Sequence, residues 1–477
     1  MGRVGGRASR LARRVILAAA SVCAVVGQRP AAADTLYGAL IQAYVNNPQL
    51  NAQRASTRAT DENVSIALSG YRPTLSATSS ISESYIDSLT RIPATPTTPK
   101  TYSRLTGENA ATSFGVTGTQ TLFNGFQTGN RTRQAEAQVF AARETLRTTE
   151  QTVLLSAATA YMNLLRDSAI VELQQSNVTV LELTLRQTRD RFIIGEVTRT
   201  DVAQAESRLA LGRSQLLAAE ANYTTSKAQY RQVIGVEPRR LAPGTSVDRF
   251  FPRTVAGAVT RGLTENPLTT TASYNVDVAV QQVKVAEGAL YPVVTASANV
   301  TKQFGVPNMP NQLQSLSAIV AGQLTVPLYQ GGAEYATIRQ AKETLGQQRL
   351  NLETARDQVR SNVVQAWAQL DAAKAQIEAT TAQVAAAEIA LAGVREEARA
   401  GQRTTLDVLN AQQDLVSARV ALVTAQHDRV VASFAVLSAV GGLSPQVLGL
   451  RIENYDPMVH YQQIRDAWGG VRTPDGR

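Results

Sequence analysis

The 477-residue sequence contains one cysteine and two histidines. Cys23 lies in an N-terminal segment that we expect to be removed, so the mature chain has no disulfide, no thiolate nucleophile and no cysteine-based metal site. Neither His427 nor His460 has a serine, cysteine or metal-ligand arrangement around it, and the sequence has no glycine-rich phosphate loop. These shortages argue against an enzyme, and the residues imply no cofactor and no metal.

Most of the excess positive charge lies at the N-terminus. The formal net charge is +9, but residues 1–33 hold six of the 47 basic residues and no acid, which leaves 41 basic and 38 acidic residues. The basic start is followed by the apolar run Val15–Val26 and by Ala31–Ala33 before Asp34, the pattern of a cleaved signal peptide. We therefore expect an exported protein with a signal peptide at 1–33, and no nucleic-acid partner.

Beyond the signal peptide, long hydrophobic runs are missing. The longest candidate, Val430–Val440, is shorter than the roughly 20 apolar residues of a membrane helix. If the protein crosses a membrane, we expect it to do so as a closed β-barrel, because only helices and closed barrels satisfy every backbone group in lipid.

Glycine and proline are absent from one very long stretch. Residues Asn130–Ile194 contain neither, and residues 333–400 contain no proline and only Gly346 and Gly393. Each stretch predicts a helix roughly 100 Å long at about 1.5 Å per residue. Such a helix cannot bury its apolar stripe in one round core, so we expect it to lie beside other long helices.

The sequence also repeats itself. Residues 119–235 match residues 325–441 at a constant offset of 206, and an upstream block matches at an offset of 219. The pairs that carry the match are Leu122 and Leu328, Gly125 and Gly331, Tyr161 and Trp367, Gly195 and Gly401, Asp201 and Asp407, and Asn47-Pro48 and Asn266-Pro267. We interpret this as an internal structural duplication, with one 13-residue insertion in the first copy.

Each copy predicts the order helix, strand, strand, long helix, turn, helix. The first copy predicts a helix at 36–70, strands at 74–86 and 110–123, and a return helix at 200–234; the second predicts helices at 255–290 and 405–440 around its own strand pair. We place the 13-residue insertion in the loop that contains Pro93, Pro96 and Pro99. Gly195 and Gly401 are expected to end the long helices in the left-handed conformation.

Four strands cannot close a membrane barrel, because known outer-membrane barrels need eight or more. The chain must therefore assemble, and three copies would supply twelve strands and a ring of helical rods. The fold class we predict is an α+β membrane protein. Three copies would bring the long helical hairpins into one trimeric α-barrel, with four strands per chain in a 12-stranded transmembrane β-barrel. The predicted parts are the repeats 34–253 and 254–445 and an irregular equatorial tail at 446–477.

The repeat, the helix breaks and the turn sequences at 195–202 and 401–411 resemble the TolC family of outer-membrane export ducts over about residues 34–445. The tail sequence 454–457 is similar to TolC-like proteins of alphaproteobacterial type. The resemblance implies a homotrimer in the outer membrane of a Gram-negative bacterium, contacting outer-membrane lipid and extending into the periplasm. It also implies tripartite drug efflux or type I protein secretion, with a periplasmic adaptor (membrane fusion protein) and an inner-membrane pump or ABC transporter as partners.

The resemblance also implies a gate at the helical turns. Asp407 matches the acidic ring that constricts the pore, while Asn410 stands where the archetype has a second aspartate. Arg403 matches an arginine that ties this turn to the inner hairpin, and Thr200 and Asp201 match its partners. The residues expected to receive the adaptor are Ile194, Gly195, Glu196, Ala400, Gly401 and Gln402.

Two alternatives stay open on the residues alone. Asp407 lies in the first turn of its helix, where an acid complements the helix dipole without any role in a gate. The glycines of the turns can serve as helix C-caps whether or not a partner binds there. For the whole protein, the alternative is a periplasmic adaptor or structural coiled-coil protein of an export machine, although paired strands and a twofold repeat argue against it.

Overall fold

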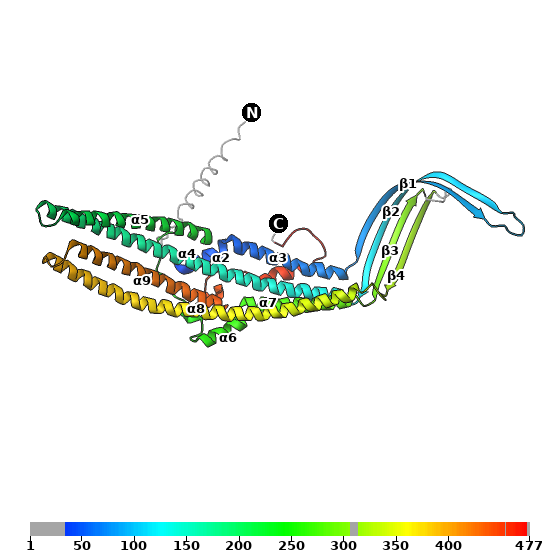
Figure 1. The fold of residues 1–477 in the computed structure, drawn as a ribbon. Helices are drawn as coiled ribbons and strands as arrows, with labels where there is room; N and C mark the ends of the chain where they lie inside the picture. The colour runs from blue at the N-terminus through cyan, green and yellow to red at the C-terminus, as the bar shows by residue number, and fades with distance from the viewer. Residues whose placement is uncertain (1–33, 306–312, 454, 475–477) are drawn as a thin grey trace, which may run out of the picture. The chain divides into compact units, whose positions relative to one another are not determined.

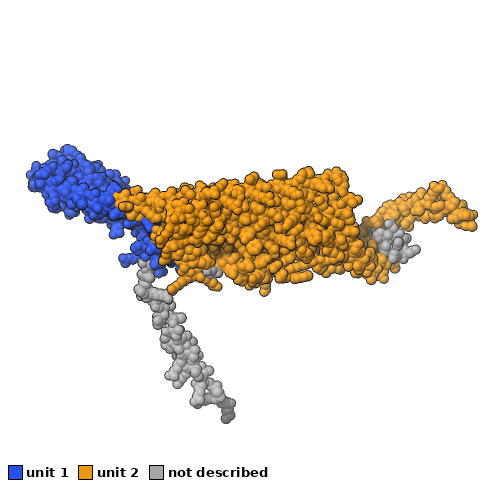
Figure 2. Space-filling model, turned by 90° about the horizontal axis from the view of Figure 1, so that it is seen from below, with its two compact units in different colours: residues 1–43, 157–245, 380–430 blue, residues 44–156, 246–379, 431–477 orange. Residues whose placement is uncertain are grey.

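A computed structural model describes residues 34–305, 313–453 and 455–474 (Figure 1). The predicted signal peptide and Asn454 of the tail motif lie outside the described residues. The chain consists of two compact units, coloured in Figure 2. Of the described residues, unit 1 contains 34–43, 157–245 and 380–430, and unit 2 contains the rest. Each unit takes segments from both expected repeats.

The order of the elements is the same in the two halves of the chain. The first half contains α2 (Leu36–Asn46), α3 (Pro48–Leu68), β1 (Thr74–Ile92), β2 (Thr101–Asn124), α4 (Gln127–Ile193) and α5 (Arg199–Ile234). The second half contains α6 (Val255–Glu265), α7 (Pro267–Gly288), β3 (Val293–Phe304), β4 (Gln314–Thr325), α8 (Ala333–Arg399) and α9 (Thr405–Ala439). Short helical turns occur at Ser69–Tyr71 and Asp248–Phe250.

The two long helices are confirmed, and each has 67 residues. The return helices α5 and α9 also agree with the predicted ranges to within one residue at each end. Among the described residues, α9 is the one helix that is long and apolar enough to cross a membrane, which we did not expect. Nearly half of its apolar stretch is buried, which is also typical of a core helix.

The helices predicted at 36–70 and 255–290 are wrong in one respect, because each is split in two. The break falls at Asn47 in the first half and at Asn266 in the second. The Asn47 side-chain oxygen accepts the backbone N–H groups of Gln49 at 2.9 Å and Leu50 at 3.2 Å. The following proline fits the first position of a new helix but has no N–H with which to continue the old one.

The four strands form one antiparallel sheet in the order β1-β2-β3-β4. Thr74 pairs with Thr119, Thr112 with Phe304, and Val293 with Thr325. The first hairpin is longer than predicted, because β1 and β2 stay paired as far as Ile92 and Thr101. The insertion therefore lengthens two strands in addition to the proline-containing loop, and β2 has no β3 partner before Thr112.

Each unit has its own apolar contacts. In unit 1, α4, α5 and α9 contribute to one core cluster: Val178, Leu181, Leu185, Ala205, Leu209 and Leu409. In unit 2, one cluster joins α3 to α4 through Val64, Ala135 and Val139, and another joins α7 to α8.

The tail is more ordered than predicted. It contains α10 (Pro445–Leu448) and α11 (Pro457–Ile464), each with proline at its start and a capping side chain before it. Within unit 2, α11 packs against α3. Outside these two short helices the described tail is irregular, and contacts between residues distant in sequence, such as that of His460 with Asp61, hold α11 in place.

Candidate functional site at two helical turns

The turn between α4 and α5 closes through glycine. Gly195 has a φ of 86°, and its N–H donates to the carbonyl of Phe192 at 3.0 Å. The N–H of Glu196 donates to the carbonyl of Arg191 at 2.9 Å. These two bonds form a Schellman motif, which satisfies carbonyls that the helix end leaves free.

The turn between α8 and α9 repeats this geometry in the same unit. Gly401 has a φ of 79°, and its N–H donates to Ala398 O at 3.2 Å, while Gln402 N–H donates to Glu397 O at 2.9 Å. The left-handed glycines predicted at both turns are confirmed. A Cβ at Gly195 or Gly401 would have no neighbour within 4 Å, so both turns are open to solvent within the described chain.

The aspartates of the two turns cap the helices that follow. The carboxylate of Asp201 accepts the Thr198 N–H at 2.8 Å, and the Thr198 hydroxyl oxygen accepts the Asp201 N–H at 3.3 Å. Thr404 and Asp407 form the same reciprocal pair, at 2.9 and 3.3 Å. Each pair is a capping box, which the threonine three residues before an acid could have predicted.

These bonds favour the charged form of both acids. The side-chain hydrogen bond from Thr198, followed by its backbone bond, lowers the pKa of Asp201 below its ordinary value. The backbone N–H of Thr404, then its hydroxyl, lowers the pKa of Asp407 in the same way. Both carboxylates are therefore ionised at neutral pH, as a helix N-terminus favours.

Arginine–glutamate pairs flank the two turns with reversed polarity. At the first turn, Arg191 Nε lies 3.0 Å from Glu196 Oε2; at the second, Arg403 Nε lies 2.9 Å from Glu397 Oε2. Glu397 is the counterpart of Arg191 at the offset of 206, so the same position carries opposite charges. The expected Arg403–Asp201 pair is not formed between these described residues, since Arg403 pairs within its own turn.

A hydrogen bond and apolar packing join the two hairpins within unit 1. Arg208 of α5 donates to the side-chain oxygen of Asn410 in α9 at 2.7 Å. The neighbouring Leu409 is buried in the cluster formed with α4 and α5. The sequence reasoning identified Asn410 but missed Arg208. The sequence does mark Arg208 as a special position, because its counterpart in the second copy is Asp414, which has the opposite charge.

An arginine–glutamate ion pair also joins the two helices of each hairpin. Arg213 pairs with Glu182 across the first hairpin, and Arg419 pairs with Glu388 across the second, both at 2.7 Å. These pairs occupy equivalent positions at the offset of 206. Because the side chains of these ion pairs are about half exposed, each pair contributes little to the free energy of unfolding. Their role is to fix how the two helices of each hairpin are aligned.

The remaining predicted residues lie at the surface of the turns. Thr200 is exposed, and its hydroxyl makes no hydrogen bond within the described chain. The first turn presents apolar side chains, with Ile193 80% and Ile194 69% exposed. The second turn has Arg399 and Ala400 at those positions, so the two turns offer different surfaces.

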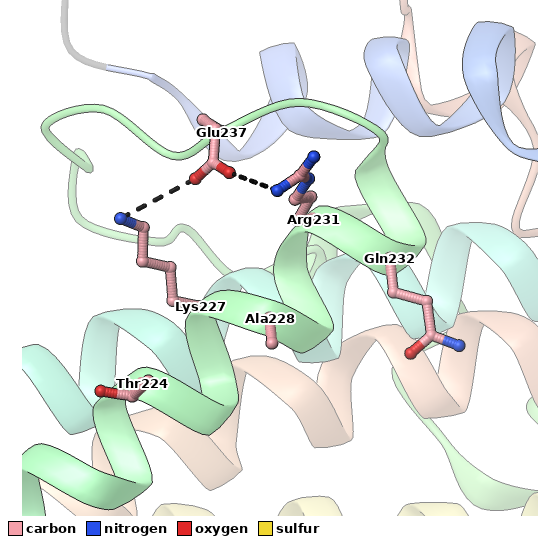
Figure 3. Close-up of a pocket in the computed structure, with 6 residues that line it drawn as sticks. All are labelled: Thr224, Lys227, Ala228, Arg231, Gln232 and Glu237. Atoms are coloured by element: carbon pink, nitrogen blue, oxygen red, sulfur yellow. Dashed lines mark ion pairs between the residues drawn. The ribbon is translucent and has the colours of Figure 1, made fainter.

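Metal-ligand clusters are not found at the turns. The described residues contain no group of three or more histidine, cysteine or acidic side chains that could hold a metal ion. A shallow pocket of about 470 Å³ lies elsewhere in unit 1, at the end of α5, where Lys227 and Arg231 pair with Glu237 (Figure 3). None of the predicted turn residues lines it.

Comparison with known proteins gives consistent results. The profile of the family described as outer membrane efflux protein matches residues 39–236 and 260–442. The chain is 41% identical to outer membrane efflux protein BepC of Brucella suis biovar 1 over 453 residues, covering 95% of each chain. It is 26% identical to outer membrane protein TolC of Escherichia coli K12 over 436 residues, covering 87% of this chain and 84% of TolC.

Solved structures agree on the fold. The Campylobacter jejuni CmeC outer membrane channel superposes with a TM-score of 0.73 at 16% identity, covering 90% of this chain and 89% of that one. The matched family and relatives are channel and transport proteins. The resemblance to the TolC family and its alphaproteobacterial type is confirmed. The chain therefore belongs to the outer membrane efflux protein family and is an outer-membrane export channel of a Gram-negative cell.

Proposed function

We propose that three copies of this chain form one exit duct across the outer membrane. The observation that carries the proposal is the pairing of the sheet. In the described residues, the outer edges of β1 and β4 have no strand partner. In lipid, unpaired backbone groups are costly. Pairing β1 of one copy with β4 of the next would satisfy both edges, and closure after three copies gives a 12-stranded barrel.

The two faces of the sheet support a barrel with lipid outside and water inside. The strand register places Ile81, Val116, Val300 and Val320 on one face, and all four side chains are at least 46% exposed in the single chain. The opposite face is polar: Asn299 donates to the Thr117 hydroxyl at 2.9 Å, and the Thr301 hydroxyl donates to Asn299 at 2.6 Å. Alternation of this kind is typical of outer-membrane strands.

The long helices would form the periplasmic α-barrel of the same trimer. Several large apolar side chains on them are exposed in the single chain, among them Leu350 at 70% and Ile389 at 75% on α8, and Leu217 at 66% on α5. Helices of a neighbouring copy would cover these side chains. The repeat of the sequence would then place two similar hairpins per copy in one wall, the internal duplication expected above.

We place the gate of the duct at the two turns. Asp407 and Asn410 would form the narrowest ring, with Arg403, Thr200 and Asp201 linking neighbouring hairpins when the gate is closed. The Arg208–Asn410 hydrogen bond supports a hairpin link at this level. The surfaces around Ile194–Glu196 and Ala400–Gln402 would receive the periplasmic adaptor, which in turn engages an inner-membrane pump or ABC transporter. Small molecules or proteins would then leave through the duct.

Fractionation of membranes tests the trimer. The expected result is a heat-resistant band of three times the monomer mass in outer-membrane fractions, which disappears on boiling in detergent. A variant with Ser317 on the polar face changed to Ala is the matched control for Val320→Asp on the opposite face. The control should retain the trimer and Val320→Asp should lose it. A soluble periplasmic monomer for the unaltered chain would contradict the proposal.

A further inference from the structure

Asp34, just before α2, is held by hydrogen bonds through its N–H, its carbonyl and its carboxylate. Its N–H donates to the carbonyl of Arg240 at 2.8 Å, and its carbonyl accepts the N–H of Ala242 at 3.0 Å. Its carboxylate accepts the N–H of Arg239 at 3.0 Å. All of these partners lie in the loop after α5, in unit 1, and Figure 3 shows this loop running beside the start of the described chain.

Tyr161 of α4 completes this arrangement. Its hydroxyl lies 2.7 Å from Asp34 O and 2.6 Å from Ala242 O, and it donates its one hydrogen to either carbonyl. The Tyr161 ring is fully buried and lies 6.4 Å from that of Tyr230, which is also buried. Burial raises the pKa of Tyr161 to about 12, so the phenol keeps its hydrogen at physiological pH.

Asp34 also directly follows Ala31–Ala33, the small residues of the predicted cleavage site. Two residues after it, Leu36 begins α2 and is 2% exposed, and Leu40 is fully buried. The chain therefore enters the core of unit 1 almost at once. Three groups of Asp34, its N–H, its carbonyl and its carboxylate, are thus bound directly before the buried start of α2.

We propose that Asp34 is the first residue of the mature chain and that this site binds its free α-amino group. Signal peptidase adds water across the Ala33–Asp34 bond, which leaves a carboxylate on Ala33 and an α-ammonium group on Asp34. The nitrogen that already donates to Arg240 O becomes that ammonium group. Its positive charge then lies next to the carbonyl and the Asp34 carboxylate, which both favour it.

Binding of the new N-terminus protects it from reagents and aminopeptidases. Asp34 is only partly exposed, and an α-ammonium group bonded to a carbonyl and a carboxylate gives up its proton less readily, so it reacts more slowly than a free amine. Tyr161 provides the buried donor that fixes the Asp34 carbonyl, so loss of its hydroxyl should increase opening. Tyr230 packs next to Tyr161 without making any of the hydrogen bonds to Asp34 and is the matched control.

Mass spectrometry and amine labelling of the protein purified from outer membranes test the proposal. The N-terminal peptide should begin at Asp34. At neutral pH, an N-hydroxysuccinimide ester should label the α-amino group at least tenfold more slowly in the folded protein than in denatured protein, while exposed Lys284 reacts rapidly in the folded protein. Tyr161→Phe should remove most of this protection, and Tyr230→Phe should retain it.

Three results would overturn the proposal: an N-terminus at another residue, equal labelling of folded and denatured protein, or equal labelling of the two folded tyrosine variants. If Tyr161→Phe does not fold, the comparison of folded and denatured unaltered protein decides the question alone. Neither readout depends on channel activity, so the result is independent of the proposed export function.

Discussion

His460 Nδ1 lies 3.0 Å from Asp61 Oδ2, and this buried pair joins the last helix, α11, to α3. Both residues are less than one-tenth exposed. The Arg143 guanidinium lies 3.8 Å from the other oxygen of Asp61 and packs over the Tyr461 ring. The counterpart of Asp61 at the offset of 219 is Val280. Only the first half of the chain has an acid at this position, and the tail contacts that half.

Asp61→Ala should weaken the attachment of α11. The change leaves the buried His460 nitrogen without its partner, a cost of about 1–3 kcal/mol. Hydrogen–deuterium exchange of the peptide 457–464 should therefore become faster, whereas Asp61→Asn, which keeps an acceptor oxygen, should change it less. Equal exchange in Asp61→Ala and the unaltered protein would show that the pair does not hold the tail.

The same pair predicts a pH dependence. Burial is the largest influence on Asp61 and raises its pKa, against the opposing effects of His460 and Arg143. The folded chain therefore binds this proton more readily than the unfolded chain, so the carboxyl's contribution to stability falls as pH rises from about 3.8 through the folded pKa. In Asp61→Asn, exchange of α11 should lose this dependence; an unchanged pH profile would assign it to another group.

Gly441 and Gly401 should respond very differently to alanine. Both have positive φ, but a Cβ at Gly441 would lie 2.6 Å from Asn266 Cα, while that at Gly401 meets open space. Gly401→Ala should cost only the left-handed strain, roughly 1–2 kcal/mol. Gly441→Ala should add a backbone clash and disturb the carbonyl that accepts from Gln151 at 2.7 Å. Heat resistance of the trimer should fall far more for Gly441→Ala, and equal losses would contradict this packing.

Asp407→Ala should change single-channel conductance and its block by cations, if Asp407 forms the constriction. Thr404→Val separates charge from capping, because it removes the capping hydroxyl and keeps the carboxylate. We expect near-normal conductance for Thr404→Val. Because hydrogen bonds from Thr404 lower the pKa of Asp407, conductance should show no Asp407 inflection between pH 5 and 8. An unaltered conductance in Asp407→Ala would remove this residue from the constriction.

Arg403→Ala and Glu397→Gln separate two roles of the arginine. Both changes break the ion pair within the α8–α9 turn, but only the first removes a positive charge from the predicted link to Thr200 and Asp201. Cells with Arg403→Ala should become more sensitive to a large antibiotic such as vancomycin, and cells with Glu397→Gln should not. Equal sensitivity of the two strains would leave Arg403 with a role in its own turn only.

The outer part of the first hairpin should be dispensable for assembly. Residues 87–106 pair only with each other, since β3 begins to pair with β2 at Thr112. Replacing 87–106 with a short turn should leave the heat-resistant trimer intact. The matched deletion in the β3–β4 hairpin, which removes Thr301 and Ser317, should reduce trimer yield. Loss of the trimer in the first deletion would show that this ribbon contributes to assembly.

The sequence predicted the helices and turns well where the signal is local. A stretch without glycine or proline predicted α4, and Gly195 and Gly401 predicted the left-handed ends. Asn47-Pro48 was recognised as a helix break in the family resemblance, but the helix at 36–70 was still predicted as continuous, although a proline inside a helical stretch signals a new helix start. The far ends of β1 and β2 were missed because they directly flank the loop with Pro93, Pro96 and Pro99, which was predicted to be longer than it is.

Contacts between distant residues could not be predicted from local patterns. Nothing near His460 in the sequence indicates that it meets Asp61. The charge reversal between Arg208 and Asp414 marks Arg208 as a special position, but it does not indicate that Asn410 is its partner. The contacts within the turns could be predicted only in part. The capping of Asp407 by Thr404 follows from spacing, whereas the partner of Arg403 depends on how the turn folds.

Recording of purified protein in planar lipid bilayers tests the central claim most directly. Trimers extracted from the outer membrane should insert and produce uniform single-channel steps, with a conductance that Asp407→Ala changes and Thr404→Val leaves near its original value. A folded, heat-resistant trimer that inserts into the bilayer and never conducts would contradict the assignment of this chain as an export channel.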